Sequence, residues 1–491
     1  VNIVSGRNGT IQTQNTSSTP ITLGSGTWKE KIVFNATGAQ TVPAGTYEDL
    51  TITGSGTKTT GGALTVNGVL SLTKANASPL LLNLEDALTG TFTTAAGDGV
   101  LILNTNTTAG DLPSGKTWNF NVSSEQSGYV LPELTMNNSI LDIRENTSLS
   151  GAVTLTGTGR ILFHGSGKVL DCVTFPINCN NNQAIGAFDT DGKIQTQAST
   201  GALTGSILFG DKVVVEFNAA GAQEVPGGTY RGGITASTSG TKTFTGTVIM
   251  AGTLTCASNV VIDANTFPLT IDFGTLTIAG NGTFYTSNIS NAPVPTSLDW
   301  SSLLEFEYRA GTTKMMAGTY SDLILNGNGT RTTEGNINCD YFYLTTSNEV
   351  AQIAPGHFIE CSTEANIIAS GSSIVLQADV SGYGQLKTPS YVGAGSVEKQ
   401  YYFAAWPIVD YVAKYGLNHP EVALPLLRYL TPLFTAEFAI RPFLEVHPEE
   451  TYSQMLMWCL DSNEHVRRLA SEGIRPRLPW GKQLAQYINN P

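Results

Sequence analysis

Charged side chains are scarce in this sequence, and basic ones most of all. Asp, Glu, Lys and Arg make up 13% of the 491 residues, with 26 Lys and Arg against 39 Asp and Glu, so the net charge is −13. Residues 401–491 hold eight of these bases and nine of these acids, which leaves −12 on the first 400 residues. Because an acidic surface repels phosphate groups, this balance argues against nucleic acid as the partner of the first 400 residues.

Cysteines and long apolar runs are also few. Six cysteines are spread along the chain, and no spacing among them is typical of a metal site. The pairs Cys172 with Cys179 and Cys339 with Cys361 are compatible with disulfides or with buried free thiols, and both remain open. No apolar run reaches the length of a membrane-spanning helix, so we expect none. The sequence begins at Val1 without Met or a signal peptide, which predicts a mature or excised fragment.

Glycine, in contrast, is abundant. The chain has 52 glycines, and Thr, Ser and Asn are the residues that accompany them. Thr fits pleated strands, while Gly and Asn adopt the positive φ of tight turns, so this mixture predicts short strands joined by turns. Disorder is excluded because 41% of the residues are hydrophobic and the net charge per residue is low.

The first 400 residues contain a large internal duplication. IQTQ at 11–14 recurs at 194–197, an offset of 183 residues. VFNATGAQTVPAGTY, which ends at Tyr47, recurs as VEFNAAGAQEVPGGTY, which ends at Tyr230, again 183 residues later. A partial third copy, MMAGTYSDLILNGNGTRTT, has Tyr320 at the same place. Two separate landmarks with one offset indicate duplication rather than chance.

A shorter repeat, of about 22 residues, lies within each large repeat. Gly252-Thr-Leu-Thr recurs 22 residues on, at Gly274, and apolar strands of four to six residues end at Gly, Asn or Asp. This spacing predicts a mainly β fold, a three-sided parallel β-solenoid, with one repeat over 1–183 and a second over 184–400 that includes the partial third copy. A series of β-sandwiches is the alternative. Within a solenoid, Cys339 and Cys361 would face each other across neighbouring turns.

The candidates for chemistry in this part are few. Asp189-Thr-Asp191-Gly resembles the start of a calcium loop, but the equivalent positions of the first repeat lack both acids, which favours an ordinary turn. His164 and His357 have no partner that the sequence identifies, which favours satisfied surface or core histidines over catalytic ones. No catalytic constellation emerges, so we expect no metal and no cofactor. A carbohydrate-active solenoid, the enzymatic alternative, would need several acids or bases within about 6–9 Å of one another.

Tyr47, Tyr230 and Tyr320 recur at one repeat position, which indicates packing or a stacking ladder; an exposed ladder would bind glycans. GAQTVPAGTYEDLTITGSGTKT resembles the repeats of bacterial surface and adhesin-like proteins exported by the type IX system. That resemblance implies a secreted or cell-surface scaffold. Its expected partners are further copies of the chain, through end-to-end assembly, or glycans and surfaces.

From residue 404 the pattern changes. PEVALPLLRYL and PEETYSQMLMWCL have apolar residues at helical spacing, and each begins with Pro and Glu, which suit a helix N-terminus. Prolines divide the segment into about four helices of ten to fourteen residues. Short paired helices of this kind predict a HEAT-like segment over 404–491.

The segment FTAEFAIRPFLEVHPEETYSQMLMWCLDSNEHVRRLASEGIRPRLPWGKQL resembles the central part of the AlkC-type DNA alkylation-repair glycosylases, which have HEAT-like repeats. The resemblance implies removal of positively charged alkylpurines from DNA. It assigns Glu437 and Glu472 as the catalytic acids, and Trp458 and Trp480 to the DNA-facing side. The cations that it assigns to DNA phosphates are Arg467, Arg468, Arg475, Arg477 and Lys482.

Each of these residues also has a purely structural interpretation. The adjacent arginines fit a solvated helix face, Trp458 fits a helix core, and either acid fits an ion pair. The family's enzymes are several times longer than this segment, so we expect no useful glycosylase activity, and DNA as a partner only if the segment is functional. An alkylpurine glycosylase remains the alternative function. Natural fusion, engineering and a composite sequence each fit the junction near residue 400.

Overall fold

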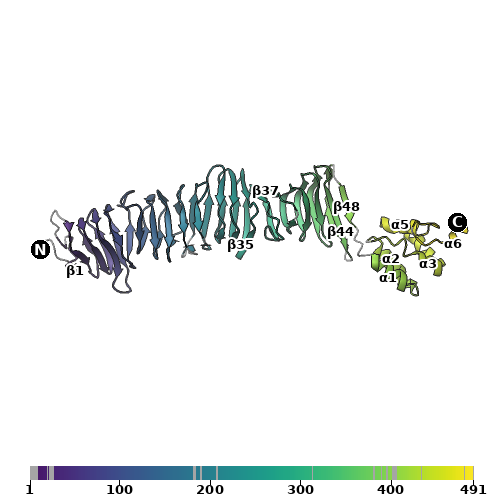
Figure 1. The fold of residues 1–491 in the computed structure, drawn as a ribbon, viewed down its shortest axis with the longest axis horizontal. Helices are drawn as coiled ribbons and strands as arrows, with labels where there is room; N and C mark the ends of the chain where they lie inside the picture. The colour runs from purple at the N-terminus through teal and green to yellow at the C-terminus, as the bar shows by residue number, and fades with distance from the viewer. Residues whose placement is uncertain are drawn as a thin grey trace. The chain divides into compact units, whose positions relative to one another are not determined.

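The chain forms two compact units, Val1–Tyr308 and Arg309–Pro491, shown in Figure 1. The computed structural model describes residues 9–18, 20–21, 27–180, 184–187, 191–205, 208–311, 313–379, 382–388, 390–393, 396–400, 406–432, 434–479 and 481–489.

The first unit consists of short strands. Its first strands are β1 (Thr10–Thr13), β2 (Thr27–Trp28), β3 (Lys31–Phe34), β4 (Gln40–Val42), β5 (Gly45–Tyr47), β6 (Leu50–Gly54), β7 (Gly56–Thr60), β8 (Leu64–Val66), β9 (Val69–Lys74), β10 (Leu80–Leu84), β11 (Leu88–Thr89), β12 (Thr93–Thr94) and β13 (Val100–Leu103). These are followed by β14 (Lys116–Trp118), β15 (Asn121–Ser124), β16 (Tyr129–Leu131), β17 (Leu134–Asn137), β18 (Ile140–Ile143), β19 (Thr147–Leu149), β20 (Val153–Thr156), β21 (Arg160–Phe163), β22 (Lys168–Asp171), β23 (Ile177–Cys179), β24 (Ala184–Ala187), β25 (Gly192–Thr196) and β26 (Leu203–Gly205). The last are β27 (Leu208–Phe209), β28 (Val213–Phe217), β29 (Gln223–Val225), β30 (Gly228–Tyr230), β31 (Gly233–Ala236), β32 (Gly240–Phe244), β33 (Val248–Cys256), β34 (Val260–Asp263), β35 (Leu269–Gly280), β36 (Thr283–Thr286) and β37 (Leu298–Tyr308).

Three strands make one coil, and successive coils stack in parallel. β3, β4 and β5 pair with β6, β7 and β8, the strands of the next coil. The register joins Ile32 to Leu50 and Gln40 to Lys58. The prediction of a parallel β-solenoid is therefore confirmed, with about 17 turns, and the alternative of serial sandwiches is wrong, because sandwiches are built from antiparallel sheets.

Alternating strand residues fill the interior of each coil. In β28, Val213, Val215 and Phe217 are buried, while the two residues between them are partly exposed. The same side chain positions stack from coil to coil, so apolar residues form continuous columns. Burial of these columns drives the stacking, since each coil alone leaves two apolar faces in water.

The recurring tyrosines belong to this interior. Tyr47, Tyr230 and Tyr320 are at most 1% exposed. Their hydroxyl groups donate to the carbonyl oxygens of Pro43 at 2.6 Å, Pro226 at 2.7 Å and Met316 at 2.8 Å, respectively. Burial raises the pKa of Tyr47 and Tyr230. The three rings thus pack a corner of the coil and present no stacking surface to a glycan.

Buried amides and cations recur with the tyrosines. The Gln40 Nε2 donates to the carbonyls of Thr13 and Asn15, both at 3.0 Å, and the equivalent Gln223 donates to Thr196 and Ala198 at 2.8 and 3.1 Å. These bonds join one coil to the coil before it. Each glutamine thus adds side-chain hydrogen bonds to carbonyl oxygens of the preceding coil.

Lys58 and Lys242, of the GTKT motif, are fully buried. The Lys58 Nζ donates to the carbonyl oxygens of Ala36 at 3.0 Å and Ser55 at 2.8 Å, and Lys242 binds the carbonyl of Ala219 in the same way. Burial lowers the pKa of both lysines. The motif therefore encodes a cation that fastens neighbouring turns.

The partial third copy has Arg331 in place of this lysine. Arg331 donates to the carbonyl of Ala310 and forms an ion pair with Glu349, and both charged side chains are fully buried. Burial raises the pKa of Glu349, although Arg331 opposes the shift. In the third copy, therefore, a buried arginine paired with a carboxylate takes the place of the buried lysine, which is bound by carbonyl oxygens alone.

Outward-facing Thr and Asn form ladders along the sheet of β14, β17, β20 and β23. One column is Thr117, Thr135, Thr154 and Asn178. In a second column, Asn137 Nδ2 donates to Asn119 Oδ1 at 2.6 Å, and Thr156 Oγ1 to Asn137 Oδ1 at 3.0 Å. The abundance of Thr and Asn follows, because identical polar side chains on stacked strands hydrogen-bond to one another.

The second unit contains further coils and then helices. Its strands are β38 (Thr313–Met315), β39 (Gly318–Leu325), β40 (Gly329–Thr333), β41 (Ile337–Leu344), β42 (Glu349–Ile353), β43 (Phe358–Ile367), β44 (Ser373–Asp379), β45 (Gly382–Tyr383), β46 (Gln385–Lys387), β47 (Tyr391–Gly393) and β48 (Ser396–Gln400). Its helices are α1 (Trp406–Tyr415), α2 (Pro420–Leu430), α3 (Arg441–Val446), α4 (Pro448–Trp458), α5 (Glu464–Gly473) and α6 (Ala485–Asn489).

The helices begin where the sequence signals them. Pro420 and Pro448 are the first residues of α2 and α4, and Asn463 caps α5 by accepting a hydrogen bond from the backbone N–H of His465 at 2.9 Å. One apolar core joins all but the shortest helices, and it includes Trp458, which is 2% exposed. No described helix is long and apolar enough to cross a membrane.

Candidate functional site

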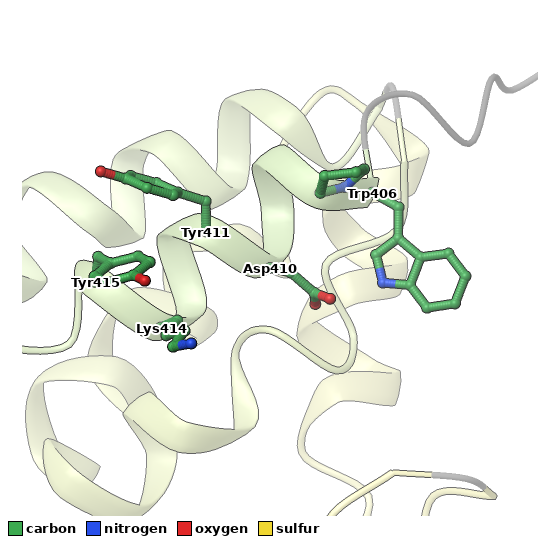
Figure 2. Close-up of a pocket in the computed structure, with 6 residues that line it drawn as sticks. Trp406, Asp410, Tyr411, Lys414 and Tyr415 are labelled. Carbon is green, nitrogen blue, oxygen red and sulfur yellow. The ribbon is translucent and has the colours of Figure 1, made fainter.

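Two hollows lie on the helical segment. The more open one, of about 420 Å³, lies along α1 and is lined by Trp406, Asp410, Tyr411, Lys414 and Tyr415. Figure 2 shows the two tyrosines and Lys414 projecting from the same stretch of α1, with Trp406 at its beginning. The tyrosine rings are 4.6 Å apart between centroids. This surface offers aromatic contact area without a pair of acids.

The second hollow, of about 200 Å³, lies between the end of α2 and α5. Its lining residues are Thr431, Phe434, Thr435, Glu437, His465 and Arg468. Phe434 also stacks on Trp406, with ring centroids 5.5 Å apart. This pocket contains one of the two acids that the sequence resemblance assigned.

Glu437 and Glu472 are brought together beside this pocket. The Arg468 Nη2 lies 3.0 Å from Glu437 Oε1 and 3.1 Å from Glu472 Oε2. The two carboxyl groups are close enough for each to shift the pKa of the other. Glu437 is 6% exposed, so this is a largely desolvated acid next to a more accessible one.

The two acids have opposite pKa shifts. Burial, and then the hydrogen bond with Glu472, raise the pKa of Glu437, while the hydrogen bond from Arg468 is the first cause that lowers the pKa of Glu472. Glu437 is therefore the more easily protonated of the two acids, and Glu472 the more readily ionised. Two nearby carboxyl groups with divided pKa values are typical of acid–base and charge-stabilising sites.

The five predicted DNA-binding cations divide into two groups. Arg467 Nη1 donates to the carbonyls of Asp461 and Ser462 at 2.8 and 2.9 Å, Arg468 binds the acid pair, and Lys482 pairs with Glu445. Arg475 and Arg477 are exposed, and within the described residues their side chains have no hydrogen bond or ion pair. Only these two are available to phosphates without breaking an internal contact.

Arg441 is the structural residue that sequence reasoning missed. It is fully buried and donates to the carbonyls of Gly473 at 2.9 Å, Arg475 at 2.8 Å and Pro476 at 3.3 Å, and also to that of Lys482. Arg441 thus holds the loop that carries the available arginines. Its only signal in the sequence is an Arg-Pro at a helix start, which does not distinguish a buried arginine from an exposed one.

Of the two tryptophans assigned to the DNA-facing side, the structure describes only one. The ring of Trp458 lies in the helical core, so the packing interpretation describes its position. Trp480 lies outside the described residues. Phe434 and His465, which sequence reasoning did not single out, line the pocket instead.

On the solenoid, His164 and His357 both have polar partners, which agrees with the interpretation of satisfied histidines. His164 Nδ1 contacts Asp142, and the Arg144 Nε lies 2.8 Å from Asp142 Oδ2 and 3.5 Å from Glu125 Oε1. The parallel register brings these residues together at the ends of β15, β18 and β21, since Glu125, Arg144 and His164 directly follow these strands. Two acids, an arginine and a histidine therefore meet in a cluster of partly exposed ion pairs.

His357 likewise has a neighbour on the preceding coil. Its Nδ1 lies 3.1 Å from Thr333 Oγ1 and 3.2 Å from the Thr333 carbonyl oxygen. Asp191, of the calcium-like turn, is described, whereas Asp189 lies outside the described residues. Among the described residues, no group of three or more His, Cys, Asp or Glu side chains is arranged to hold a metal ion.

Comparisons with known proteins concern a small part of the chain. No family model matches it. It is 51% identical over 82 residues to "Uncharacterized protein YhaZ" of Bacillus subtilis (strain 168), which is 17% of this chain and 23% of that protein. A solved structure, "Pseudomonas fluorescens alkylpurine DNA glycosylase AlkC bound to DNA containing an abasic site analog", is 46% identical, with a TM-score of 0.18, over 18% of this chain and 25% of the other. The chain thus spans about a quarter of the length of each.

Proposed function

We propose that the solenoid is a structural scaffold that is secreted or displayed on the cell surface, where it presents its coils to other copies of the chain or to glycans. One observation carries this proposal. Both large repeats contain the same three buried side chains, a glutamine, a tyrosine and a lysine, and each hydrogen-bonds to backbone carbonyl oxygens. Such residues contribute to holding coils together and not to any site. The resemblance of the repeat motifs to bacterial surface proteins supports the location.

Intact cells that produce the chain are expected to bind an antibody raised against the solenoid without permeabilisation. A cytoplasmic protein of the same cells, labelled only after permeabilisation, is the control. Light scattering of the purified chain tests assembly, and we expect the apparent mass to rise with concentration. Labelling that requires permeabilisation contradicts the location, and a monomer at all concentrations contradicts self-assembly.

A second candidate function belongs to the helical segment: excision of a positively charged alkylated purine. The observation that favours it is that Arg468 joins Glu437 and Glu472 beside a pocket of about 200 Å³. The inactivity expected from sequence assumed that the helices fixing both acids lie elsewhere. In the structure Arg468, which lies within the segment, contacts both carboxyl groups, and we therefore propose activity in its place.

The chemistry follows from the charges. When a cationic base leaves, the bond between the sugar carbon and the base nitrogen breaks and its electrons go to the base, which becomes neutral. Positive charge then develops on the sugar, and an ionised carboxylate already in place stabilises it. Glu472 takes this role, and Arg468 and Glu437 position it; water completes the hydrolysis at the sugar carbon.

DNA binding by the full chain is expected to be weak and to depend on Arg475 and Arg477. Two available arginines neutralise two phosphates, so the logarithm of the binding constant should fall with the logarithm of salt with a slope of about −2. The double variant R475Q/R477Q should lose both the binding and the slope in a fluorescence-anisotropy titration. Arg467→Gln is the matched control, since that side chain is already bound to Asp461 and Ser462; an equal loss in the control contradicts the assignment.

A further inference from the structure

Cys339 and Cys361 lie side by side on consecutive coils of the second unit. Cys339 is on β41 and Cys361 on β43, and the parallel register pairs them directly. Their Sγ atoms are 3.6 Å apart, and the residues are 4% and 2% exposed. We propose that this pair is a modification site, at which an inter-coil disulfide forms by exchange with a small-molecule or protein disulfide during folding.

The backbone already suits a disulfide at this position. Neighbouring strands are about 4.8 Å apart, which lies within the range of Cα separations that disulfides bridge. Since the two sulfur atoms are in contact, small side-chain rotations bring them to bonding distance without a backbone shift. The predicted placement of this pair across neighbouring turns is thus confirmed, and its covalent state is the new element.

No other cysteine has such a partner in the part of the chain that the structure describes. Cys172 and Cys179 are both buried free thiols, and no contact joins them. The Cys256 Sγ faces the carbonyls of Val260 at 3.4 Å and Thr283 at 3.7 Å. Cys459 is exposed on the helical segment. The chain therefore contains its own controls.

The exchange balances with one disulfide oxidant. The thiolate of one cysteine attacks a sulfur of the oxidant, which releases one thiol and leaves a mixed disulfide on the protein. The second thiolate then attacks the protein-bound sulfur, forms the Cys339–Cys361 bond and releases the second thiol. Two electrons pass to the oxidant, and the two protein protons end on its two thiols.

The folded pair is protected from this reaction. The hydrogen bond with Cys361, followed by burial, raises the pKa of Cys339, and the thiolate is the reactive species. Exchange is therefore slow once the coils have closed and fast while they are open. The same burial protects the finished bond from reductants.

The disulfide would close a covalent loop that contains one whole coil. The two cysteines are 22 residues apart, and β42, with the buried Glu349, lies between them. A crosslink that closes this loop restricts the unfolded chain and holds the coil around the Arg331–Glu349 pair.

The test uses the full chain, reduced and unfolded in denaturant and then refolded in a mixture of oxidised and reduced glutathione. Peptide mapping by mass spectrometry should find a Cys339–Cys361 crosslink two hydrogens lighter than the dithiol, with Cys172 and Cys179 uncrosslinked. When oxidised glutathione is added only after folding, Cys459 should react first and the pair slowly.

Matched variants sharpen the result. Cys361→Ser should abolish the crosslink, whereas Cys256→Ser, another buried cysteine, should retain it. If a variant fails to fold, the peptide map of the refolded wild-type chain still shows whether the Cys339–Cys361 crosslink forms. Free thiols at both positions after refolding in the glutathione mixture, or a crosslink from either cysteine to a different one, would overturn the proposal.

Discussion

Replacing Arg441 by methionine is expected to destabilise the helical segment by about 3 kcal/mol, because a buried carbonyl that loses its donor costs about 1–3 kcal/mol. Arg441 serves the carbonyls of Gly473, Arg475 and Pro476 from one fully buried guanidinium. Methionine has a similar length and fills much of the space, so the loss is mainly one of hydrogen bonds. Chemical denaturation of the full chain, followed by the helical circular dichroism signal, measures it.

The loop itself gives a second readout for Arg441. Freed from the guanidinium, the segment around Arg477 should be cut by trypsin after Arg477, earlier than in the wild type. Arg441→Lys should be intermediate, since a lysine donates from one point and cannot match the fork of a guanidinium.

The matched control for Arg441 is Arg428→Met. Arg428 is half-exposed and pairs at 2.6 Å with Asp461, whose side chain is largely buried; because one end of the pair stays in water, we expect a smaller loss than for the fully buried Arg441. Equal stability changes in the two variants would show that Arg441 is not a central support of the loop.

The sequence predicted the solenoid because its signals are local. Strand length, turn residues and the 183-residue offset between Tyr47 and Tyr230 can be read along the chain, and the helix starts at Pro420 and Pro448 have explicit N-terminal signals. Both depend on residues close in sequence, which is where composition and periodicity are informative.

Contacts between coils could not be predicted in the same way. His164 meets Asp142 across 22 residues, but Arg331 meets Glu349 across 18. The offset varies because turns between strands differ in length, so a residue's neighbour on the next coil depends on every insertion between them. The buried lysines show the same limit: GTKT was visible as a repeat, but not as a cation inside the coil.

For the candidate site, the sequence predicted which acids take part but not how they interact. A motif resemblance assigned Glu437 and Glu472, but their opposite pKa shifts depend on burial and on Arg468, which the same resemblance had assigned to phosphate. Neither feature follows from residue type, since an arginine on a helix is compatible with solvent, phosphate or a carboxylate.

Release of an alkylated purine is expected to fall about 100- to 1,000-fold in Glu472→Gln, the loss typical of removing one charge-stabilising group. Glutamine keeps the size of Glu472 and its side-chain oxygen can accept from Arg468, but it lacks the negative charge that stabilises the sugar cation. The assay incubates the full chain with methylated duplex DNA and measures the free base by chromatography.

Controls on the same helix separate catalysis from folding. Glu464→Gln, an exposed acid at the start of α5, should release base like the wild type, and circular dichroism should be unchanged in both variants. Because Arg468 lowers the pKa of Glu472, its carboxylate stays charged below the ordinary glutamate pKa of about 4.3. Acid should therefore not abolish release through this group until the pH is lower still. No base release by the wild type, with DNA binding intact, would remove the enzymatic proposal and leave Glu437, Arg468 and Glu472 as a structural ion-pair network.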